Sequence, residues 1–473
     1  MKKQSKKGSF VRFKRNSTTI SILTYSLTLL VVKLLWLNSQ EGRGLLGADG
    51  ENYLEALGGL WKDGFFSNQG KLSYWPAGYP ILMWPVAELS LNNLAFYVGA
   101  IQSVIFAICV SFFCVEISKS SLKRFTWPAM HLLNLSPTLS LNSVAIGYEV
   151  TSAVIFLLVI GLYLRQIRLE KTSVLNFENF LASFALAVSC FMQPRMILLA
   201  MGILIPFAIY HFRLKLIPGF LILSLVIVSF APGVLIFRNI KAQDFVAVST
   251  NLGTTMNIGA GPKSTGGYTN QATGVPCDPV EGNAAERDSH LLGCVIKWYL
   301  DNPIPTGKLL VNKFVFHWSP WFGPLANGTM ARNPWRDFHP FVAAESTLSG
   351  ERMVNGVLGK TVSWVWLLGT LALLINGFLA LRRRGGISTL LAWSMFIPVL
   401  LNTASSMGTI GDHRFRIPTL TLSILLQLFG LYAIFERRSF KRGLDGNFRL
   451  AQGLNWKGRG QGDNLQPWQK KSS

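Results

Sequence analysis

The residues best suited to chemistry lie in one stretch, from Gly47 to Pro85, directly after the first long apolar segment. This stretch carries Asp49, Glu51 and Lys71 and ends in an aromatic, proline-rich run. A carboxylate such as Asp49 could take a proton from a hydroxyl or amine as a new bond forms, which is general-base catalysis. The alternative is a helix N-cap, since Asp49 precedes NYLEALGGLW, and the pattern alone favours the cap.

A second carboxylate, Glu149, opens a later apolar run, directly after Ala145-Ile146-Gly147-Tyr148. The topology derived below places it on the same side of the membrane as Asp49, where it could assist Asp49 or hold a metal. The alternative is a first-turn glutamate that the helix dipole favours.

Four arginines fall at the boundaries of apolar segments on that same side: Arg195, Arg238, Arg414 and Arg416. Guanidinium groups form bidentate hydrogen bonds with phosphate, so they point to an anionic lipid head group. For any single arginine, snorkelling of the side chain towards the membrane surface is the simpler explanation. Four on one side favour the phosphate hypothesis.

Composition defines the class of protein in which these residues act. Half of the 473 residues are hydrophobic, 14% are charged, and the mean hydropathy is +0.34, as is typical of a polytopic membrane protein. The formal net charge of +22 would suggest nucleic acid in a soluble protein, but here the positions of the charges follow the membrane topology. We expect no nucleic-acid partner.

The apolar runs predict an all-α fold of about ten transmembrane helices. The runs lie near residues 20–37, 94–115, 127–146, 151–164, 180–192, 196–212, 216–237, 361–381, 387–401 and 420–435.

Lysine and arginine set the orientation, because short cytoplasmic connections are enriched in them. With residues 1–19 inside, every second connection is basic, and both termini face the cytoplasm. The predicted organisation begins with a basic N-terminus (residues 1–19) and a helical region (20–237) that contains the first external loop (38–93). An external domain (238–360), further transmembrane helices (361–435) and a disordered basic tail (436–473) follow.

Residues 238–360 predict a small mixed external domain. It contains an amphipathic stretch, AAERDSHLLGCVIKWYLDNP, and then KLLVNKFVFHWSPWFG, which is typical of a helix lying in the membrane interface. Cys277 and Cys294 share this domain. They could form a disulfide in an oxidising compartment, or lie there without being bonded.

These motifs together resemble the GT-C glycosyltransferases, the polytopic enzymes that include protein O-mannosyltransferases and lipid A aminoarabinose transferases. The first span, its outer loop and WPAGYP are similar to their first loop. Four later segments are similar to subsequent elements in the same order: LNLSPTLSLNSVAIGYEVTSAVIFLL, QPRMILL, FRNIKAQDFVAVSTNLGTTMNIGAGPKSTGG and HRFRIPTLTLSILL. The resemblance covers most of residues 20–435.

The resemblance implies transfer of a sugar from a polyprenyl-phosphate donor to a lipid, glycan or protein acceptor at the outer face of the cytoplasmic membrane. In this sequence Gly50 separates the two acids of the first loop, and Lys71 lies several residues before WPAGYP. The candidate catalytic residues are Asp49, Glu51 and Glu149, and the candidate substrate-binding residues are Tyr53, Lys71, Arg195, Arg238, Arg414 and Arg416. The mechanism implied is an inverting transfer with Asp49 as base and no cofactor, although a divalent metal stays possible.

Two other classes fit parts of the sequence. A transporter or flippase of lipid-linked saccharide would show paired halves and ionisable groups near the membrane midplane, but we find no internal repeat, and Lys33 is the one clear charge within a span. A non-catalytic assembly protein would keep the external domain without needing Asp49.

Overall fold

The computed structural model describes residues 6–40, 44–47, 49–68, 71–170, 173–213, 216–243, 248–268, 274–320 and 356–445. Within these ranges the protein is built from helices, and its one β feature is an isolated parallel bridge between Leu45 and Ala145. The all-helical architecture predicted from the apolar runs is confirmed for this part of the chain. The predicted mixed character of the external domain is not seen in its described part, which is helical.

Seven of the described helices are long and apolar enough to cross a membrane, as expected of a multi-pass membrane protein. They are α1 (Lys6–Ser39), α4 (Leu94–Ser118), α7 (Glu149–Arg168), α10 (Ile217–Gln243), α16 (Val357–Arg384), α17 (Gly386–Gly408) and α18 (Ile417–Asp445). Two shorter apolar helices, α8 (Phe177–Met192) and α9 (Met196–Arg213), match two further predicted spans.

The run expected to form one span over residues 127–146 is divided in the structure. Helix α5 (Thr126–Leu135) ends before Pro137, and the short helix α6 (Pro137–Asn142) follows. Proline disfavours helical geometry at the residue before it, and Ser136 is indeed extended. The Ser136 side chain then caps α6 by accepting from the Leu139 N–H. The consequence is an irregular segment, residues 143–148, that leads into α7.

Helix α7 is central to the bundle. In its apolar window 83% of the residues are buried, compared with 17% for α1 at the edge. Helices α4, α8 and α18 all pack against α7. Because Glu149 is its first residue, the N-terminus of the most buried span carries a carboxylate.

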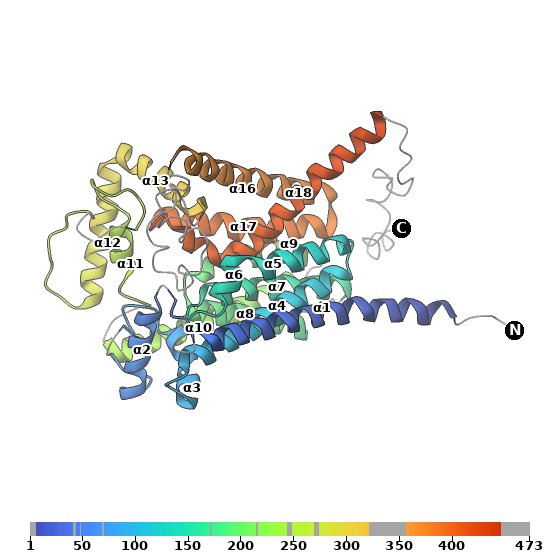
Figure 1. Cartoon of the computed structure of the whole chain (residues 1–473). Helices are drawn as coiled ribbons and strands as arrows, with labels where there is room; N and C mark the ends of the chain where they lie inside the picture. Colours follow the sequence, from blue (N-terminus) through green and yellow to red (C-terminus); the bar gives the residue numbers. More distant parts are fainter. Residues whose placement is uncertain are drawn as a thin grey trace.

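The two ends of the bundle differ. The N-terminal end of α1 and the C-terminal end of α18 lie at one end, whereas α2 (Gly50–Asp63), α11 (Leu252–Ile258) and α12 (Ala284–Asp301) lie at the other (Figure 1). Helices α3 (Gly78–Leu89) and α13 (Pro303–Trp318) complete that second end.

Helices α11 and α12, which lie within the predicted external domain, are held by a disulfide and by polar contacts. A disulfide joins Cys277 to Cys294 on α12, which decides between the two readings left open by the sequence. Asp288 of α12 accepts hydrogen bonds from the backbone N–H groups of Gly253 and Thr254 on α11. The predictions for residues 321–355 and for the tail after 445 lie outside the described residues.

Candidate active site

Asp49 lies where the first loop enters α2, and its side chain does not cap that helix. Asp49 stands at the N-cap position without a side-chain capping bond. Its Oδ2 instead lies 3.0 Å from Nη2 of Arg414, and both side chains are about one-tenth exposed. The capping alternative is therefore not how the structure uses this carboxylate.

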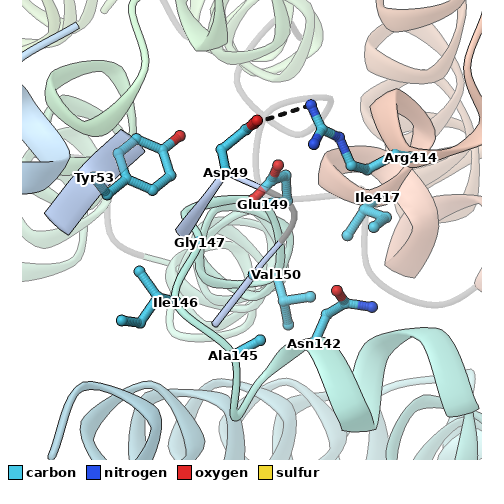
Figure 2. A pocket seen from close by; sticks show the side chains of 11 residues that line it. Asp49, Tyr53, Asn142, Ala145, Ile146, Gly147, Glu149, Val150, Arg414 and Ile417 are labelled. Carbon is cyan, nitrogen blue, oxygen red and sulfur yellow. Dashed lines mark ion pairs between the residues drawn. The ribbon is translucent and has the colours of Figure 1, made fainter. Parts of the chain in front are cut away.

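The Asp49 pair forms one wall of a pocket whose floor is the segment before α7. Figure 2 shows the side chains of Asp49, Glu149 and Arg414 converging there, with Tyr53 to one side. Ala145, Ile146 and Gly147 contribute the floor, and Asn142, Val150 and Ile417 are among the remaining lining residues. Three residues that the sequence analysis assigned to one site thus meet, although two come from the first half of the chain and one from its end.

A short 3-10 helix, η6 (His413–Arg416), presents Arg414 to this pocket. The Asp412 side chain accepts a hydrogen bond from the Arg414 N–H at 2.8 Å and so caps η6. From α17, Asn402 Nδ2 donates to the Phe415 carbonyl at 2.7 Å and to Thr419 Oγ1 at 3.0 Å. The guanidinium therefore projects from a turn that is fixed on both sides.

Two buried tyrosines lie beside the carboxylates. Burial, with smaller effects from Tyr148, Glu149 and Asp49, raises the pKa of the Tyr53 phenol well above its ordinary value. Burial also raises the pKa of Tyr148, which lies directly before α7. Both phenols therefore stay protonated at neutral pH, and they serve as hydrogen-bond groups rather than as bases.

Arg195, between α8 and α9, extends the site towards a more basic region. Its Nη2 donates to the Tyr148 hydroxyl at 2.7 Å, and its guanidinium stacks 4.6 Å from the centre of the Phe415 ring. Through Tyr148 and Phe415, this arginine is linked to the elements that carry Glu149 and Arg414.

Arg416 occupies the far side of η6 and is buried against the end of α13. Its Nη1 donates to the Trp318 carbonyl at 3.2 Å, and its guanidinium lies 5.7 Å from the Trp318 ring. Next to it, His317 is fully buried, and burial, followed by the charges of Arg416 and Arg195, lowers the pKa of His317 well below its ordinary value.

Several nitrogens in this basic region have no hydrogen-bond partner among the described residues: Nε of Arg195, Arg414 and Arg416, both ring nitrogens of His317 and of His413, and Nε1 of Trp318. Buried polar groups are normally paired, and a neutral imidazole has one donor N–H and one acceptor nitrogen. The unused donors are therefore the three Nε–H groups, one N–H of each imidazole and the Trp318 Nε1–H. Such an arrangement suits an anion, because guanidinium and neutral imidazole N–H groups all donate.

Three predicted site residues lie elsewhere. Glu51 is exposed on α2, and Lys71 is half-buried with its ammonium 5.2 Å from the Tyr74 ring. Arg238 is fully buried on α10, where it donates to the carbonyls of Phe65 at 2.9 Å and of Ser67. A further bond to Asn239 Oδ1 at 2.7 Å orients the guanidinium. Through the two carbonyls, Arg238 holds the first loop against α10.

The sequence analysis missed the role of α13. The mixture of lysine, tryptophan and apolar residues indicated an interfacial helix, but the structure buries Lys313, His317 and Trp318 against α17 and η6. Lys313 Nζ donates to the Thr409 carbonyl at 2.5 Å and to the Tyr299 hydroxyl at 2.8 Å. The signal in the sequence was His317, which stands among the apolar residues of this helix. The polar face of an interfacial helix is typically lysine or arginine, so a histidine on the apolar side indicates burial against protein.

The described residues contain no group of three or more histidine, cysteine, aspartate or glutamate side chains arranged to hold a metal ion. Asp49 and Glu149 share the pocket, but a guanidinium accompanies them. Among the described residues, the positive charge that faces the Asp49 carboxylate is the guanidinium of Arg414.

No protein-family model matches the sequence. No curated protein sequence matches it either.

Solved structures similar in fold include an archaeal oligosaccharyltransferase, AglB, from Archaeoglobus fulgidus. In the structure of AglB in complex with an inhibitory peptide and a dolichol-phosphate, the protein sequence is 12% identical to this one. The TM-score is 0.42, and the match covers 91% of this chain and 53% of that chain. The Archaeoglobus fulgidus oligosaccharyltransferase in the apo form is 12% identical, with a TM-score of 0.46 over 90% of this chain and 53% of that chain. The chain therefore spans about half the length of these structural neighbours, and what they bind is said of them alone.

Proposed function

We propose that the protein is an integral-membrane glycosyltransferase that moves a sugar from a polyprenyl-phosphate donor to an acceptor at the outer face of the cytoplasmic membrane. The observation that carries the proposal is the pocket in which Asp49 and Glu149 face Arg414, next to further arginines whose Nε atoms have no partner among the described residues. One half of this site suits a proton acceptor, and the other half suits an anionic leaving group.

Asp49 is the base of the proposed reaction. Its carboxylate lies directly before α2, and the protonated Tyr53 in the same pocket can orient an acceptor hydroxyl but cannot take its proton. Glu149 assists from the N-terminus of α7, where the helix dipole favours a negative charge.

The leaving group is held by Arg414 and Arg416, with Arg195 in support. Phosphate bound by guanidinium groups is stabilised most as it gains charge, which is when the glycosidic bond to it lengthens. The Nε atoms of these arginines and the neutral imidazole of His317 supply donors that no described protein group uses.

The bond changes balance without a cofactor. The acceptor oxygen forms a bond to the anomeric carbon, its proton passes to Asp49, and the bond from the anomeric carbon to the phosphate oxygen breaks. The electron pair of that bond leaves with the polyprenyl phosphate, and the configuration at the anomeric carbon inverts because attack and departure occur on opposite faces. A phosphate leaving group needs no general acid at neutral pH.

The test is sugar transfer in membranes supplied with polyprenyl-phosphate-linked sugars, measured as release of polyprenyl phosphate. Asp49→Asn should lower turnover by about a hundredfold or more, because that is the usual cost of removing a general base. The matched control is Glu55→Gln, because Glu55 is an exposed carboxylate on α2, the helix that follows Asp49. Release of polyprenyl phosphate by Asp49→Asn at half the wild-type rate or faster would falsify the assignment, and movement of intact donor without its cleavage would instead indicate a flippase.

A further inference from the structure

The floor of the pocket is an irregular backbone segment, residues 143–147, which we call the strap. It connects α6 to α7 and ends two residues before Glu149. A segment outside regular structure must pair its backbone polar groups with other partners, particularly when it is buried. Four of the five strap residues are buried, so these partners determine where it lies.

Two side chains from other helices bind the strap. The Gly147 N–H donates to the Tyr79 hydroxyl at 2.8 Å, and the Tyr79 hydroxyl donates to Gln102 Oε1 at 2.8 Å. Gln102 Nε2 then donates to the Ala145 carbonyl at 2.6 Å. Tyr79 and Gln102 thus form a closed hydrogen-bonded bracket that holds the strap at two points.

The opposite edge of the strap holds the loop that carries Asp49. The Ile146 N–H donates to the Leu45 carbonyl at 3.1 Å, and Leu45 and Ala145 form the parallel bridge. Gly47 approaches the Ile146 carbonyl so closely that a Cβ at this position would clash with it. The strap is therefore the shared support of both carboxylates, since the Asp49 loop is hydrogen-bonded to it and Glu149 follows it in the chain.

Lys33, the charge within the first span, reaches the beginning of the same strap. Its Nζ donates to Ser143 Oγ at 3.0 Å and lies 3.9 Å from the centre of the Phe106 ring. Ser103 Oγ contacts the Ser143 carbonyl at 3.5 Å. Helices α1, α3 and α4 thus all contribute a polar side chain to one short piece of backbone.

We propose that Tyr79 and Gln102 are positioning residues, which set the separation of the Asp49 and Glu149 carboxylates by fixing the strap between them. This inference rests on the proposed glycosyl transfer. Neither side chain lines the pocket, so neither is expected to touch a substrate. Loss of the bracket should move a carboxylate relative to the acceptor, and a displacement of about 1 Å can cost about a hundredfold in rate.

The first variant is Tyr79→Phe, which removes the shared hydroxyl and keeps the ring. The matched control is Tyr97→Phe, because Tyr97 lies on α4 and is 41% exposed. We expect Tyr79→Phe to lower kcat by about 10- to 100-fold while KM for the donor changes by no more than about twofold, because the phosphate-binding arginines lie on other elements. The control should retain wild-type kcat.

The second variant is Gln102→Glu, which keeps an oxygen for the Tyr79 hydroxyl. An ionised carboxylate cannot donate to the Ala145 carbonyl, whereas a protonated one can. We therefore expect a loss of kcat at neutral pH that recovers, relative to wild type, as the pH is lowered. A residue that served only the stability of the fold would recover kcat and Tm together, so the positioning role requires kcat to recover while Tm stays unchanged across the same pH range. The double variant should lose less than the product of the two single losses, because both break one bracket.

Failure of the inference is distinct from failure of the proposed function. If wild type does not transfer sugar, or Asp49→Asn transfers it as well as wild type, the proposed function is overturned. If Asp49→Asn is inactive but Tyr79→Phe and Gln102→Glu stay within twofold of wild-type kcat, the positioning role is overturned alone. The same holds if both variants lose donor binding and thermal stability in proportion to kcat. Should Tyr79→Phe not accumulate in membranes, the pH-dependent recovery of Gln102→Glu decides the question by itself.

Discussion

Asp49 and Arg414 are bonded to each other in the structure, although the proposed reaction needs each of them for a different partner. An acceptor hydroxyl must reach a carboxylate oxygen of Asp49, and the donor phosphate must reach the guanidinium of Arg414. Both requirements are met if the phosphate takes Arg414 from Asp49, since guanidinium binds either anion in the same bidentate geometry. Donor binding would then release the base, and donor and acceptor would bind in that order.

This exchange predicts a change in the chemical reactivity of Asp49. Polyprenyl phosphate, added alone, should increase modification of Asp49 by a water-soluble carbodiimide, because the carboxylate loses its ion-pair partner. Peptide mass spectrometry measures the modification, and exposed Glu55 on α2 should be modified equally with and without the lipid. Unchanged Asp49 labelling at a saturating lipid concentration would contradict the exchange.

Arg416 makes a second prediction at this scale. Arg416→Lys should weaken binding of polyprenyl phosphate by about tenfold, because lysine lacks the planar fork that binds phosphate through two parallel bonds. Equilibrium binding of the labelled lipid measures the loss, and Arg383→Lys at the other end of the bundle is the control. Equal affinity in Arg416→Lys and wild type would indicate that Arg416 only binds the Trp318 carbonyl and does not bind phosphate.

Residue types and spacing predicted part of the site. Asp49, Glu149 and Arg414 were expected to share a side of the membrane, and the structure brings all three into one pocket. The same reasoning could not separate them from Glu51, which is exposed, or from Arg238, which clamps loop carbonyls. A boundary arginine has the same pattern whether its partner is a phosphate or a backbone carbonyl, so only the fold distinguishes the two.

At the scale of elements, α13 connects α12 to the turn that carries the arginines. Lys313 is the connection, since its ammonium group binds Tyr299 of α12 and the Thr409 carbonyl at the end of α17. Gly411 packs directly on the Lys313 backbone, where a Cβ would clash with the backbone atoms of that lysine. The mixture of lysine, tryptophan and apolar residues predicted this helix as an interfacial one, but it could not predict its burial, which depends on α17 and η6.

Burial lowers the pKa of Lys313 from 10.5 to about 7, and this predicts how stability changes with pH. Between about pH 7 and pH 10 the unfolded chain carries a proton on Lys313 that the folded protein lacks, so stability should rise with pH in this window. Lys313→Met should remove that contribution and flatten the dependence of Tm on pH, as measured by thermal unfolding in detergent. Lys308→Met on the same helix is exposed and serves as the control.

A profile for Lys313→Met that is as steep as wild type above pH 7 would show that another group is responsible. Tyr299, whose pKa burial raises to about 12, is the titratable partner of Lys313, and it stays protonated throughout this range.

The strap, residues 143–147, is a second element whose structure the sequence did not predict. Hydropathy predicted one helix over residues 127–146, because apolar residues recur along the whole run, and Pro137 was the sign of a break. The interruption matters for function, since the strap can approach the Asp49 loop only where the helix has ended.

Over the whole molecule, the distribution of charge and the arrangement of helices agree. The ends of α1 and α18 that adjoin the chain termini both lie at the end of the bundle opposite α2 and α12 (Figure 1). Basic residues predicted to face the cytoplasm form ion pairs between helices, including Arg168 with Glu116 at 2.8 Å and Arg384 with Glu436 at 3.1 Å. Part of the positive charge therefore joins helices to one another and lies outside the candidate site.

The final prediction concerns sidedness, on which the proposed reaction depends because a lipid-linked donor presents its sugar to one face. Single cysteines at exposed positions Glu55, Lys263 and Gly408 should react with an impermeant maleimide added to intact cells. Cysteines at exposed Ser121 and Arg383 should react only after the membrane is broken. The background should replace the three buried free cysteines, Cys109, Cys114 and Cys190, and keep the disulfide, which does not react with maleimide.

Labelling at Gly408 is the decisive measurement, because this residue ends α17 just before the turn that carries Arg414 and Arg416. If Gly408 is protected in intact cells while Glu55 is labelled, Arg414 cannot reach Asp49 from its side of the membrane, and the ion pair and the mechanism built on it are both excluded. If Glu55, Lys263 and Gly408 are all protected while Ser121 and Arg383 are labelled, the pocket survives but opens to the cytoplasm. The donor would then have to present its sugar inside the cell, and the proposed acceptor at the outer face would be wrong.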